Sequence, residues 1–288
     1  MRAALLRLGE WLGALAWLLH LRRAVARDGL RRAFPDLTDA QRKKIGRASY
    51  VQLGRSLAEI LLPLRDEDLA TVRTEGWEIL ERGLAQGRGL VGAIAHFGNF
   101  ELLARVSVRR GLKLSVIVRQ LRDPFGRWLL ADRTRMGVGQ LSERGTSREA
   151  LAVLRRGGTL AIAVDQNMRP SRGIFVEFFG EKACTTPAAA VFALRSGAPL
   201  IAAFSIRQAD GRHLIRIRGP FTTALSGHAA VVDLTQQVTR AVEEEIRQHP
   251  DHWFWVHRRW KTRPSGAKPH AEESTVGVHR QRDRQRDR

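Results

Sequence analysis

A histidine and a glutamate five residues apart are the side chains of this sequence best placed for acid–base chemistry. His96 follows an apolar segment, residues 89–95, that predicts a buried strand, and Gly98 and Asn99 then predict a sharp turn and a helix N-cap. Residues five apart on one helix point about 140° away from each other, but a strand, turn and helix can bring imidazole and carboxylate together. We predict that Glu101 orients the His96 ring, which makes His96 a general base for a hydroxyl group.

The position of this pair is more informative than its spacing, which recurs by chance. The active crevice of an open α/β sheet lies at the carboxyl ends of its strands. Arg119 also ends a predicted strand, and we expect it at the same edge as His96, where a guanidinium can hold a phosphate or a developing oxyanion. A surface arginine that caps a strand is an equal alternative. Asp165 and Gln166 end a third strand, and Asp165 either orients Arg119, contacts substrate or caps the next loop.

Two later segments combine aromatic and polar residues. In the first, Phe175 and Phe178 either pack in the core or line an acyl-chain groove, and Thr185 or Thr186 is predicted to cap a helix that begins at Pro187. The second segment, residues 253–260, holds three tryptophans beside basic residues and in isolation fits a nucleic-acid surface. The signatures of RNA-binding modules are missing from the sequence, so we expect no nucleic acid as partner.

The elements that must position these residues alternate along the chain. A helix is expected from an N-cap at Thr38 to about Leu62, where Pro63 ends it. The alternation after it predicts an α/β fold, a mostly parallel mixed sheet flanked by helices. The predicted strands are 89–95, 113–118, 159–164, 174–178, 199–206 and 213–218, and the predicted helices are 99–110, 125–136, 147–156, 187–196 and 230–248.

Composition narrows the class of protein. The chain has 288 residues and 43% hydrophobic residues, which suffices for a folded domain with a large core. Its net charge of +20 favours an anionic partner, although an arginine-rich composition raises the charge of a protein with no specific target as well. A single cysteine, Cys184, excludes an internal disulfide, and the scattered histidines predict no metal site.

The two ends of the chain differ from its middle. Residues 1–27 are predicted to form a membrane-associated helix, in which leucines recur at helical spacing beside two tryptophans. The stretch from Trp11 to Leu21 is eleven residues long, whereas a spanning helix needs ~20, so we expect a helix that lies in the interface. Packing of this helix on the core is the alternative. Residues 28–264 would form the catalytic domain, and residues 265–288 a disordered basic tail.

Several of these segments occur together, in the same order, in one known family. The sequence resembles the bacterial lipid A secondary acyltransferases, the lauroyl/myristoyl branch of the lysophospholipid acyltransferase superfamily, over roughly residues 12 to 264. The matching segments are 30–35, 40–45, 53–59, His96 to Glu101, Val118 with Arg119, Asp165 with Gln166, 178–180 with Thr185 and Thr186, and 255–264. Phe100 and Pro187 depart from the family pattern, which more often has tryptophan and a small residue there.

The resemblance implies an acyltransferase that moves a fatty acyl group from acyl carrier protein to a hydroxyl of a lipid A precursor or related glycolipid. His96, Glu101 and Arg119 would be its catalytic residues, and no metal or organic cofactor would be needed. The predicted substrate-binding residues are Asn99, Asp165, Gln166, Thr185 and Thr186. Acyl carrier proteins are acidic, so a basic docking face agrees with the net charge.

We expect such a protein at the cytoplasmic face of an anionic inner membrane. Two alternatives stay open. One is transfer to a different lipid acceptor, a lysophospholipid or a glycosylated phosphoinositide. The other is a non-catalytic basic protein that binds membrane or RNA, for which polyanion binding would be steeply salt-dependent. Acyl-chain length and oligomeric state do not follow from the sequence.

Overall fold

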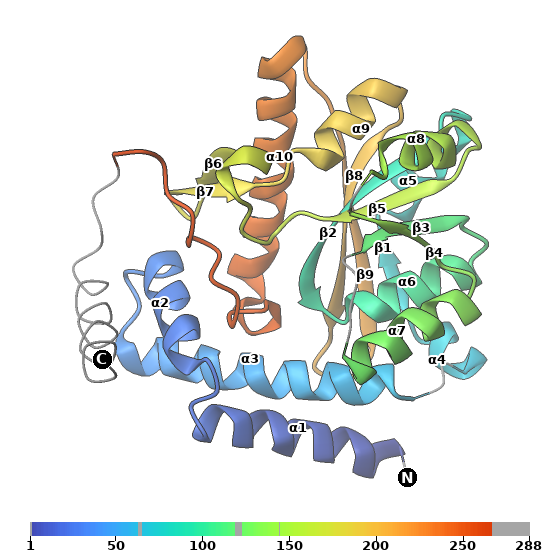
Figure 1. Cartoon of the computed structure of the whole chain (residues 1–288). Helices are drawn as coiled ribbons and strands as arrows, with labels where there is room; N and C mark the ends of the chain where they lie inside the picture. Colours follow the sequence, from blue (N-terminus) through green and yellow to red (C-terminus); the bar gives the residue numbers. More distant parts are fainter. Residues whose placement is uncertain (1, 63–64, 119–122, 144, 267–288) are drawn as a thin grey trace, which may run out of the picture.

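A mixed sheet with helices on both faces is the framework of the protein (Figure 1). The computed structural model describes residues 2–62, 65–118, 123–143 and 145–266. Within these residues the strands are β1 (Arg73–Glu75), β2 (Leu90–Gly98), β3 (Leu114–Val118), β4 (Gly139–Ser142), β5 (Thr159–Ala163), β6 (Ile174–Phe178), β7 (Glu181–Thr185), β8 (Leu200–Arg207) and β9 (His213–Phe221). The helices are α1 (Arg2–Leu18), α2 (Arg23–Ala33), α3 (Asp39–Ile60), α4 (Asp66–Ala70), α5 (Trp77–Ala85), α6 (Phe100–Arg109), α7 (Pro124–Arg135), α8 (Ser147–Arg155), α9 (Ala188–Ser196) and α10 (Gly227–Gln248).

The main sheet has the order β1-β9-β8-β2-β5-β3-β4. All its neighbouring strands pair in parallel except β8 and β9, which are antiparallel. The predicted mostly parallel mixed sheet is therefore confirmed. The predicted strand 174–178 forms as β6, but it pairs with β7 in a separate two-stranded antiparallel hairpin. Residues 181–185 begin with a glutamate and a lysine, and this polar start concealed the second strand of the hairpin from the sequence pattern.

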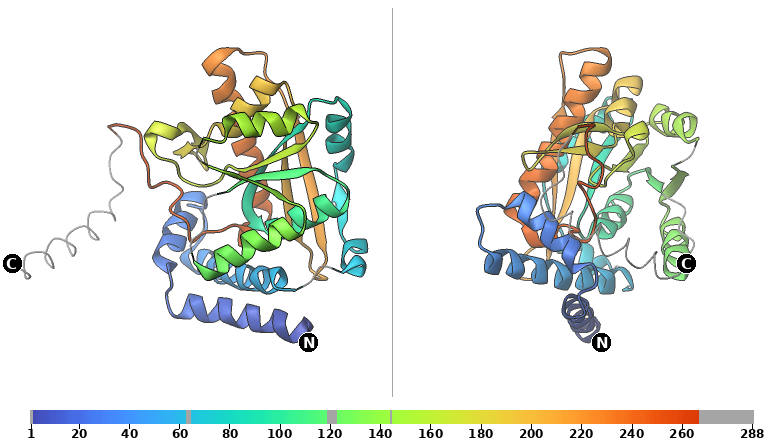
Figure 2. Two further views of the ribbon diagram at one scale, coloured as in Figure 1. Left: turned by 45° about the vertical axis from the view of Figure 1, so that its right-hand side comes forward. Right: turned by 60° about the vertical axis from the view of Figure 1, so that its left-hand side comes forward.

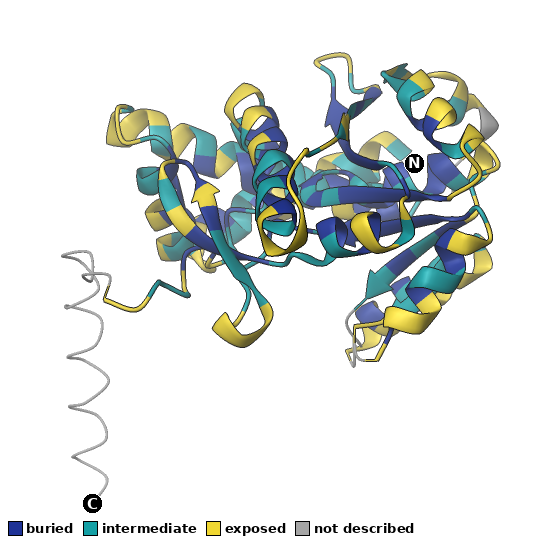
Figure 3. Cartoon of the chain, turned by 90° about the horizontal axis from the view of Figure 1, so that it is seen from above, coloured by how far each residue is buried: buried dark blue, intermediate teal, exposed yellow. Residues whose placement is uncertain are grey.

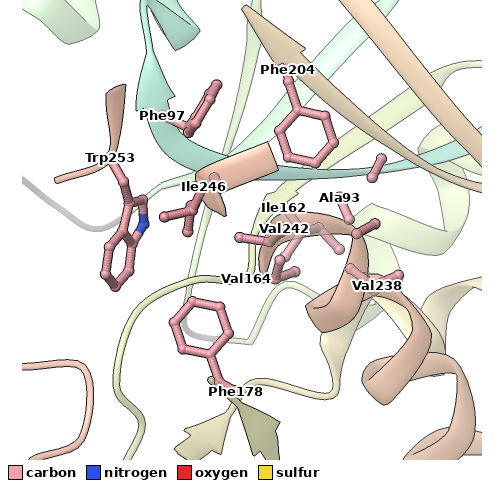
Figure 4. Packing of buried hydrophobic residues seen from close by; sticks show 14 of the residues in the cluster. Ala93, Phe97, Ile162, Val164, Phe178, Phe204, Val238, Val242, Ile246 and Trp253 are labelled. Carbon is pink, nitrogen blue, oxygen red and sulfur yellow. The ribbon is translucent and has the colours of Figure 1, made fainter. Parts of the chain in front are cut away.

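The two faces of the sheet carry different side chains of β2, because successive residues of a strand point to opposite faces. Val91, Ala93, Ala95 and Phe97 belong to the largest buried cluster, which α9 and α10 complete. Figure 4 shows this packing around Ala93, with Val238, Val242 and Ile246 of α10 close to Ile162 of β5. The opposite face of β2 is covered by α5 and α6. Seen from above, the buried strands lie between helices whose outer faces are exposed (Figure 3).

The predicted helix 38–62 forms as α3. Thr38 is its N-cap and makes a capping box with Gln41, in which the Thr38 hydroxyl accepts a hydrogen bond from the Gln41 backbone N–H and the Gln41 side chain accepts one from the Thr38 backbone N–H. Leu61 caps the other end, and the predicted terminator, Pro63, lies outside the described residues. The helix crosses below the sheet near the end of β2, and α1 lies along its far side (Figures 1 and 2).

The N-terminal segment is two helices rather than the one helix predicted. The chain turns between α1 and α2, where His20 and Arg22 take the left-handed backbone conformation, with φ of 59° and 55°. The two helices meet at 88°. Among the described residues, no single helix has both the length and the apolar composition to cross a membrane, and only α1 and α2 taken as a pair pass that test.

Glycines hold α1 tightly against α3. Gly9 and Gly13 of α1 face Gly54 of α3, and a Cβ on any of the three would lie within 2.4 Å of a backbone oxygen of the other helix. Trp17 packs edge-on against Tyr50, with ring centroids 5.2 Å apart. One side of α1 is thus part of the folded core, as the alternative to membrane association requires, while its other side stays exposed. The predicted tail, residues 265–288, falls almost entirely outside the described residues.

Candidate active site

The turn between β2 and α6 places the predicted catalytic histidine at the edge of the sheet. Gly98 has φ 56°, and a Cβ there would lie 1.7 Å from the carbonyl oxygen of Ser205, so glycine alone fits. The Asn99 side chain accepts a hydrogen bond from the Leu102 N–H at 2.9 Å and caps α6. The predicted turn and N-cap are therefore confirmed. β2 itself extends three residues beyond its predicted end at 95.

Asp165 is the carboxylate that holds the imidazole of His96. The His96 Nδ1 atom lies 2.9 Å from one carboxylate oxygen of Asp165, and the His96 backbone N–H donates to the other at 3.0 Å. The two residues meet because β2 and β5 are parallel neighbours and each strand carries polar residues near its carboxyl end. With Nδ1 as donor to the carboxylate, Nε2 is the basic nitrogen of the ring.

Burial and charge act in opposite directions on this pair. Burial disfavours the imidazolium, but the negative charge of Asp165 and its hydrogen bond outweigh burial and raise the pKa of His96 above 6.5. Burial likewise opposes ionisation of Asp165, yet the charge of His96 and three donated hydrogen bonds lower the pKa of Asp165 to about 2. The carboxylate is therefore ionised at neutral pH and stabilises a proton on His96.

A segment far along the chain completes the support of Asp165. The indole N–H of Trp253 donates to Asp165 Oδ2 at 2.8 Å, and the Phe254 backbone N–H donates to the carbonyl of His96 at 3.1 Å. Trp253, Trp255 and Trp260 are all buried. The aromatic and basic segment 253–260 is therefore part of the site's framework, and its tryptophan rings are not available as an exposed stacking platform.

Glu101 does not take the place predicted for it. It is buried on the first turn of α6, and both its oxygens accept hydrogen bonds from the Arg133 guanidinium of α7, one of them at 3.0 Å from Nε. The predicted orientation of the His96 ring by Glu101 is therefore replaced by the contact with Asp165. Glu101 still acts on His96 through its charge, which raises the pKa of the imidazole, while Arg133 opposes it.

Gln166 lies directly against the His96 ring. Its side-chain nitrogen is 3.3 Å from His96 Nε2 and 3.5 Å from Nδ1. The imidazole side chain is 26% exposed and borders a small cavity of about 30 Å³ that is lined by α3 residues and by Phe100, Phe254 and their neighbours. A hydroxyl group that approaches Nε2 would have to displace the Gln166 amide, and the predicted role of Gln166 in substrate binding stays a prediction.

The threonine pair contacts Arg259 and the start of α9 and does not line the cavity at His96. Thr185 is fully buried, and its hydroxyl accepts a hydrogen bond from the guanidinium of Arg259, which also donates to the carbonyl of Cys184 at 2.9 Å. Burial lowers the pKa of Arg259 to about 10. The Thr186 hydroxyl accepts from the Ala188 N–H at the start of α9. The N-cap position of α9 is Pro187, which has no side-chain cap, so the predicted cap by a threonine is replaced by this contact from Thr186, one residue before it. The predicted role of both threonines in substrate binding stays a prediction.

A second buried hydrogen-bond network, which was not predicted from the sequence, holds the side chain of Asn99 against α3. The Asn99 amide donates to Glu59 of α3 at 2.8 Å, and Glu59 in turn binds the Arg207 guanidinium and the ring of His213. Burial opposes ionisation of Glu59, but these donors outweigh it and lower its pKa. The start of α6, and with it the turn after His96, is tied to α3 and β8.

Arg119, the third predicted catalytic residue, lies outside the described residues. Asp165 as the partner of His96, and Trp253 and Arg133 as supports, were not identified from the sequence. The sequence does show that Asp165 lies at the end of a strand, as His96 does. That the two residues contact each other follows only from the structure, in which β2 and β5 are neighbours. In the described part of the chain, His, Cys, Asp and Glu side chains do not gather in groups of three that could hold a metal ion.

Comparison with known proteins identifies the family of the chain. Residues 2–262 match the sequence model of the family described as bacterial lipid A biosynthesis acyltransferases. A lipid A biosynthesis lauroyltransferase of Escherichia coli (strain K12) is 30% identical over 268 residues, which cover 90% of this chain and 86% of the relative. A palmitoleoyltransferase of the same organism is 27% identical over 269 residues, 90% of this chain and 85% of the relative. An acyltransferase of Haemophilus influenzae is 27% identical over 255 residues, 86% and 80% of the two chains. The chain accordingly belongs to the bacterial lipid A biosynthesis acyltransferase family and is an acyltransferase.

Proposed function

We propose that the protein transfers a fatty acyl group from acyl carrier protein to a hydroxyl of a lipid A precursor or related glycolipid, with His96 as general base. The contact between His96 and Asp165 at the end of β2 carries this proposal. It leaves Nε2 as the basic nitrogen at an opening, in a chain whose relatives are named for acyl transfer in lipid A biosynthesis.

The proposed reaction is a direct attack. His96 Nε2 removes the proton of the acceptor hydroxyl, and the oxygen attacks the thioester carbonyl to form a tetrahedral intermediate. Asp165 stabilises the imidazolium by its hydrogen bond, and Glu101 does so through its charge. When the intermediate collapses, the C–S bond breaks and the thiolate takes the proton from His96. Arg119, which follows β3 in the sequence, is proposed to stabilise the oxyanion or to hold a substrate phosphate.

A basic hollow supports acyl carrier protein as the donor. Arg23, Arg27 and Arg31 of α2 and Arg42 and Lys43 of α3 surround a hollow of about 240 Å³, where Asp39 is the single acidic residue of the lining and pairs with Arg42. Such a concentration of positive charge favours association with an acidic protein and mainly accelerates their encounter.

The donor is tested by reversing charge in the hollow. With Arg27→Glu and Lys43→Glu combined, we expect KM for acyl carrier protein thioesters to rise at least about tenfold, since like charges then meet at the contact. Transfer from an acyl-pantetheine, which lacks the carrier protein, should not change. Arg195→Glu, an exposed arginine on α9, is the matched control. Equal loss with both donors would exclude a carrier-docking role for the hollow.

The exposed side of α1 supports attachment to a membrane surface, with the protein proposed to act at the cytoplasmic face of the inner membrane. Trp11 is 60% exposed, and Arg7 and Arg22 are exposed beside this apolar surface. A helix with an outward apolar side and flanking arginines is typical of interfacial binding to anionic lipid. The exposed apolar side chains are Leu8, Trp11, Leu12, Leu18, Leu19 and Leu21.

Sedimentation with phosphatidylglycerol vesicles tests the attachment. Trp11→Ser with Leu12→Ser should weaken binding, because it removes two exposed apolar side chains from α1. Leu225→Ser removes a similarly exposed leucine in the loop before α10 and should have no effect. Unchanged binding of the α1 variant would refute this mode of attachment.

The reaction itself is tested by incubating radiolabelled acyl carrier protein with a membrane lipid extract and identifying the product by mass. We expect an acylated glycolipid with the wild type and none with His96→Ala. An acylated lysophospholipid or glycosylated phosphoinositide as product would show that the acceptor is a different lipid, while the reaction would still be acyl transfer. Wild-type turnover in folded His96→Ala would refute the base assignment. Absence of any product with several acyl donors would favour a non-catalytic basic protein.

A further inference from the structure

The face of β2 that carries His96 also carries a row of side chains leading away from it into the protein. Because side chains alternate along a strand, His96, Ile94 and Gly92 point to the same face, the one covered by α6. Gly92 lies about 13 Å from His96 along the strand, at about 3.3 Å per residue. The row therefore extends from His96 to the middle of the sheet.

Gly92 faces an empty space. A Cβ added to this residue would have no heavy atom within 4 Å, although the residue is buried in a central strand of the sheet. Its neighbour in β5 on the same face is Ala161, and above it α6 presents Ala104 and Ser107. Small residues from three elements thus leave an apolar cavity of about 50 Å³ between α6 and the sheet.

The apolar packing on this face is divided at the cavity. One buried cluster joins α5 and α6 to β8 and β9, and a second, separate cluster joins Leu114 and Val116 of β3 to Ala161. Ile94 is the side chain that packs against both. A protein core is normally packed as densely as an organic crystal, with few voids. The cavity thus lies where the two clusters meet, in a place that could admit an apolar group.

Phe100 stands between this cavity and the catalytic opening. Its ring contacts the His96 ring edge-on, with centroids 5.1 Å apart, and it borders both the small cavity at His96 and the cavity at Gly92. Phe100 and Ile94 are only partly buried. A fatty acyl chain is larger than the cavity, so these two side chains must move apart for a chain to pass from the opening to Gly92.

We propose that the acyl chain of the donor enters between α6 and the sheet past Phe100, and that the depth at Gly92 limits its length. The inference rests on the proposed acyl transfer and adds the acyl-chain subsite to it. The closed end beyond Gly92 is formed by side chains of four elements and the loop before β3, namely Leu80, Leu90, Leu112, Leu114 and Thr159, with Leu103 of α6 above them.

The test compares transfer from acyl carrier protein thioesters of graded chain length. Gly92→Ala and Gly92→Val fill the cavity stepwise, and we expect kcat/KM for the longest accepted donor to fall at least about tenfold while the shortest donor is unaffected. Leu112→Ala, at the closed end, should admit a longer donor. Val91→Ile adds a methyl group to the opposite, tightly packed face of the same strand and should leave chain-length preference unchanged.

Thermal unfolding separates failure of this subsite from failure of the proposed reaction. Free fatty acids of graded length should raise the unfolding temperature of the wild type in a length-dependent way, and Gly92→Val should shift that dependence to shorter chains without lowering its own unfolding temperature. This result would support the subsite even if no acyl transfer were observed. An unchanged length dependence in folded Gly92→Val, in either binding or transfer, would overturn the proposal.

Discussion

Asp165→Asn is the most discriminating change at this site, because it keeps the shape of the side chain and removes its charge. The carboxylate accepts three hydrogen bonds. Oδ2 accepts from the His96 backbone N–H at 3.0 Å and from the Trp253 indole at 2.8 Å, and Oδ1 faces His96 Nδ1 at 2.9 Å. An asparagine has one oxygen, and two of the three donors are fixed at the Oδ2 position. The amide oxygen will therefore occupy that position and turn its NH₂ group toward Nδ1.

This orientation forces the wrong tautomer of the imidazole. Facing an N–H donor, Nδ1 of His96 must accept, so the ring proton moves to Nε2, the nitrogen that has to remove the acceptor proton. The analogous aspartate-to-asparagine change in a serine-protease triad lowers kcat about 10⁴-fold for this reason. The charge-assisted hydrogen bond to the ring is also lost, which costs roughly 1.5–3 kcal/mol, or about 10- to 100-fold. We expect kcat of Asp165→Asn to fall between roughly 10²- and 10⁴-fold.

Single-turnover acyl transfer measures the effect without interference from product release. The fold should survive, since both donors at Oδ2 keep their partner, and circular dichroism with a thermal scan checks this. Asp165→Ala serves as the contrasting variant, because it leaves three donors unpaired and should be less stable as well as inactive. Asp165→Asn that folds and retains more than about a tenth of wild-type kcat would refute the assignment of Asp165 as the residue that orients His96.

Further expectations concern the pH dependence of activity and stability, the buried ion pair of Glu101 and Arg133, and the hydrogen bond from Trp253 to Asp165. Activity should rise with pH through a pKa above 6.5, because burial lowers the pKa of His96 but Asp165 and Glu101 together raise it by more. Glu101→Gln removes one of these charges and should move the rising limb of the pH–rate profile to lower pH. A limb that does not move would exclude the charge effect of Glu101. Arg133→Met leaves Glu101 buried without its partner and should cost about 3–5 kcal/mol in urea denaturation, whereas the double variant with Glu101→Gln should recover most of this loss. The lowered pKa of Asp165, about 2, adds roughly 2 kcal/mol of stability that is present above pH 4 and is lost as pH falls toward 2, so Asp165→Asn should flatten the stability profile between pH 4 and pH 2. Trp253→Phe removes one donor from Asp165 and should lower kcat about tenfold with the fold intact, checked by the same single-turnover assay.

The strands and helices that could be predicted from the sequence are those with a strong local pattern. β2, β5 and β8 are apolar runs, and α6 and α10 carry an apolar stripe, so each was predicted close to its observed bounds. The elements that were missed, β1, β4, β7, α4 and α5, include short strands such as Arg73–Glu75 and Gly139–Ser142. These two strands have no buried residue, and they form because a neighbouring strand offers backbone partners.

The residues of the site likewise fall into those whose position follows from the local sequence and those whose position depends on contacts between distant segments. Gly98 and Asn99 are determined by the turn and cap that they form, and both were predicted. The pairing of His96 with Asp165 joins residues 69 positions apart and depends on the order of strands in the sheet. Glu101 was paired with His96 because it is near in sequence, whereas Arg133 outcompetes the imidazole for it: a guanidinium binds both carboxylate oxygens at once.

The contacts of Trp253 and Phe254 with the end of β2 have a consequence for the order in which the protein matures. During synthesis the sheet from β1 to β9 and the long helix α10 emerge before residue 253 does. Until this last segment docks, Asp165 lacks its indole donor and the His96 carbonyl lacks its backbone partner. A nascent or truncated chain that ends after α10 therefore carries every predicted catalytic side chain and still lacks a finished catalytic centre. The support of Asp165 and His96 is therefore complete only after residues 253 and 254 have docked.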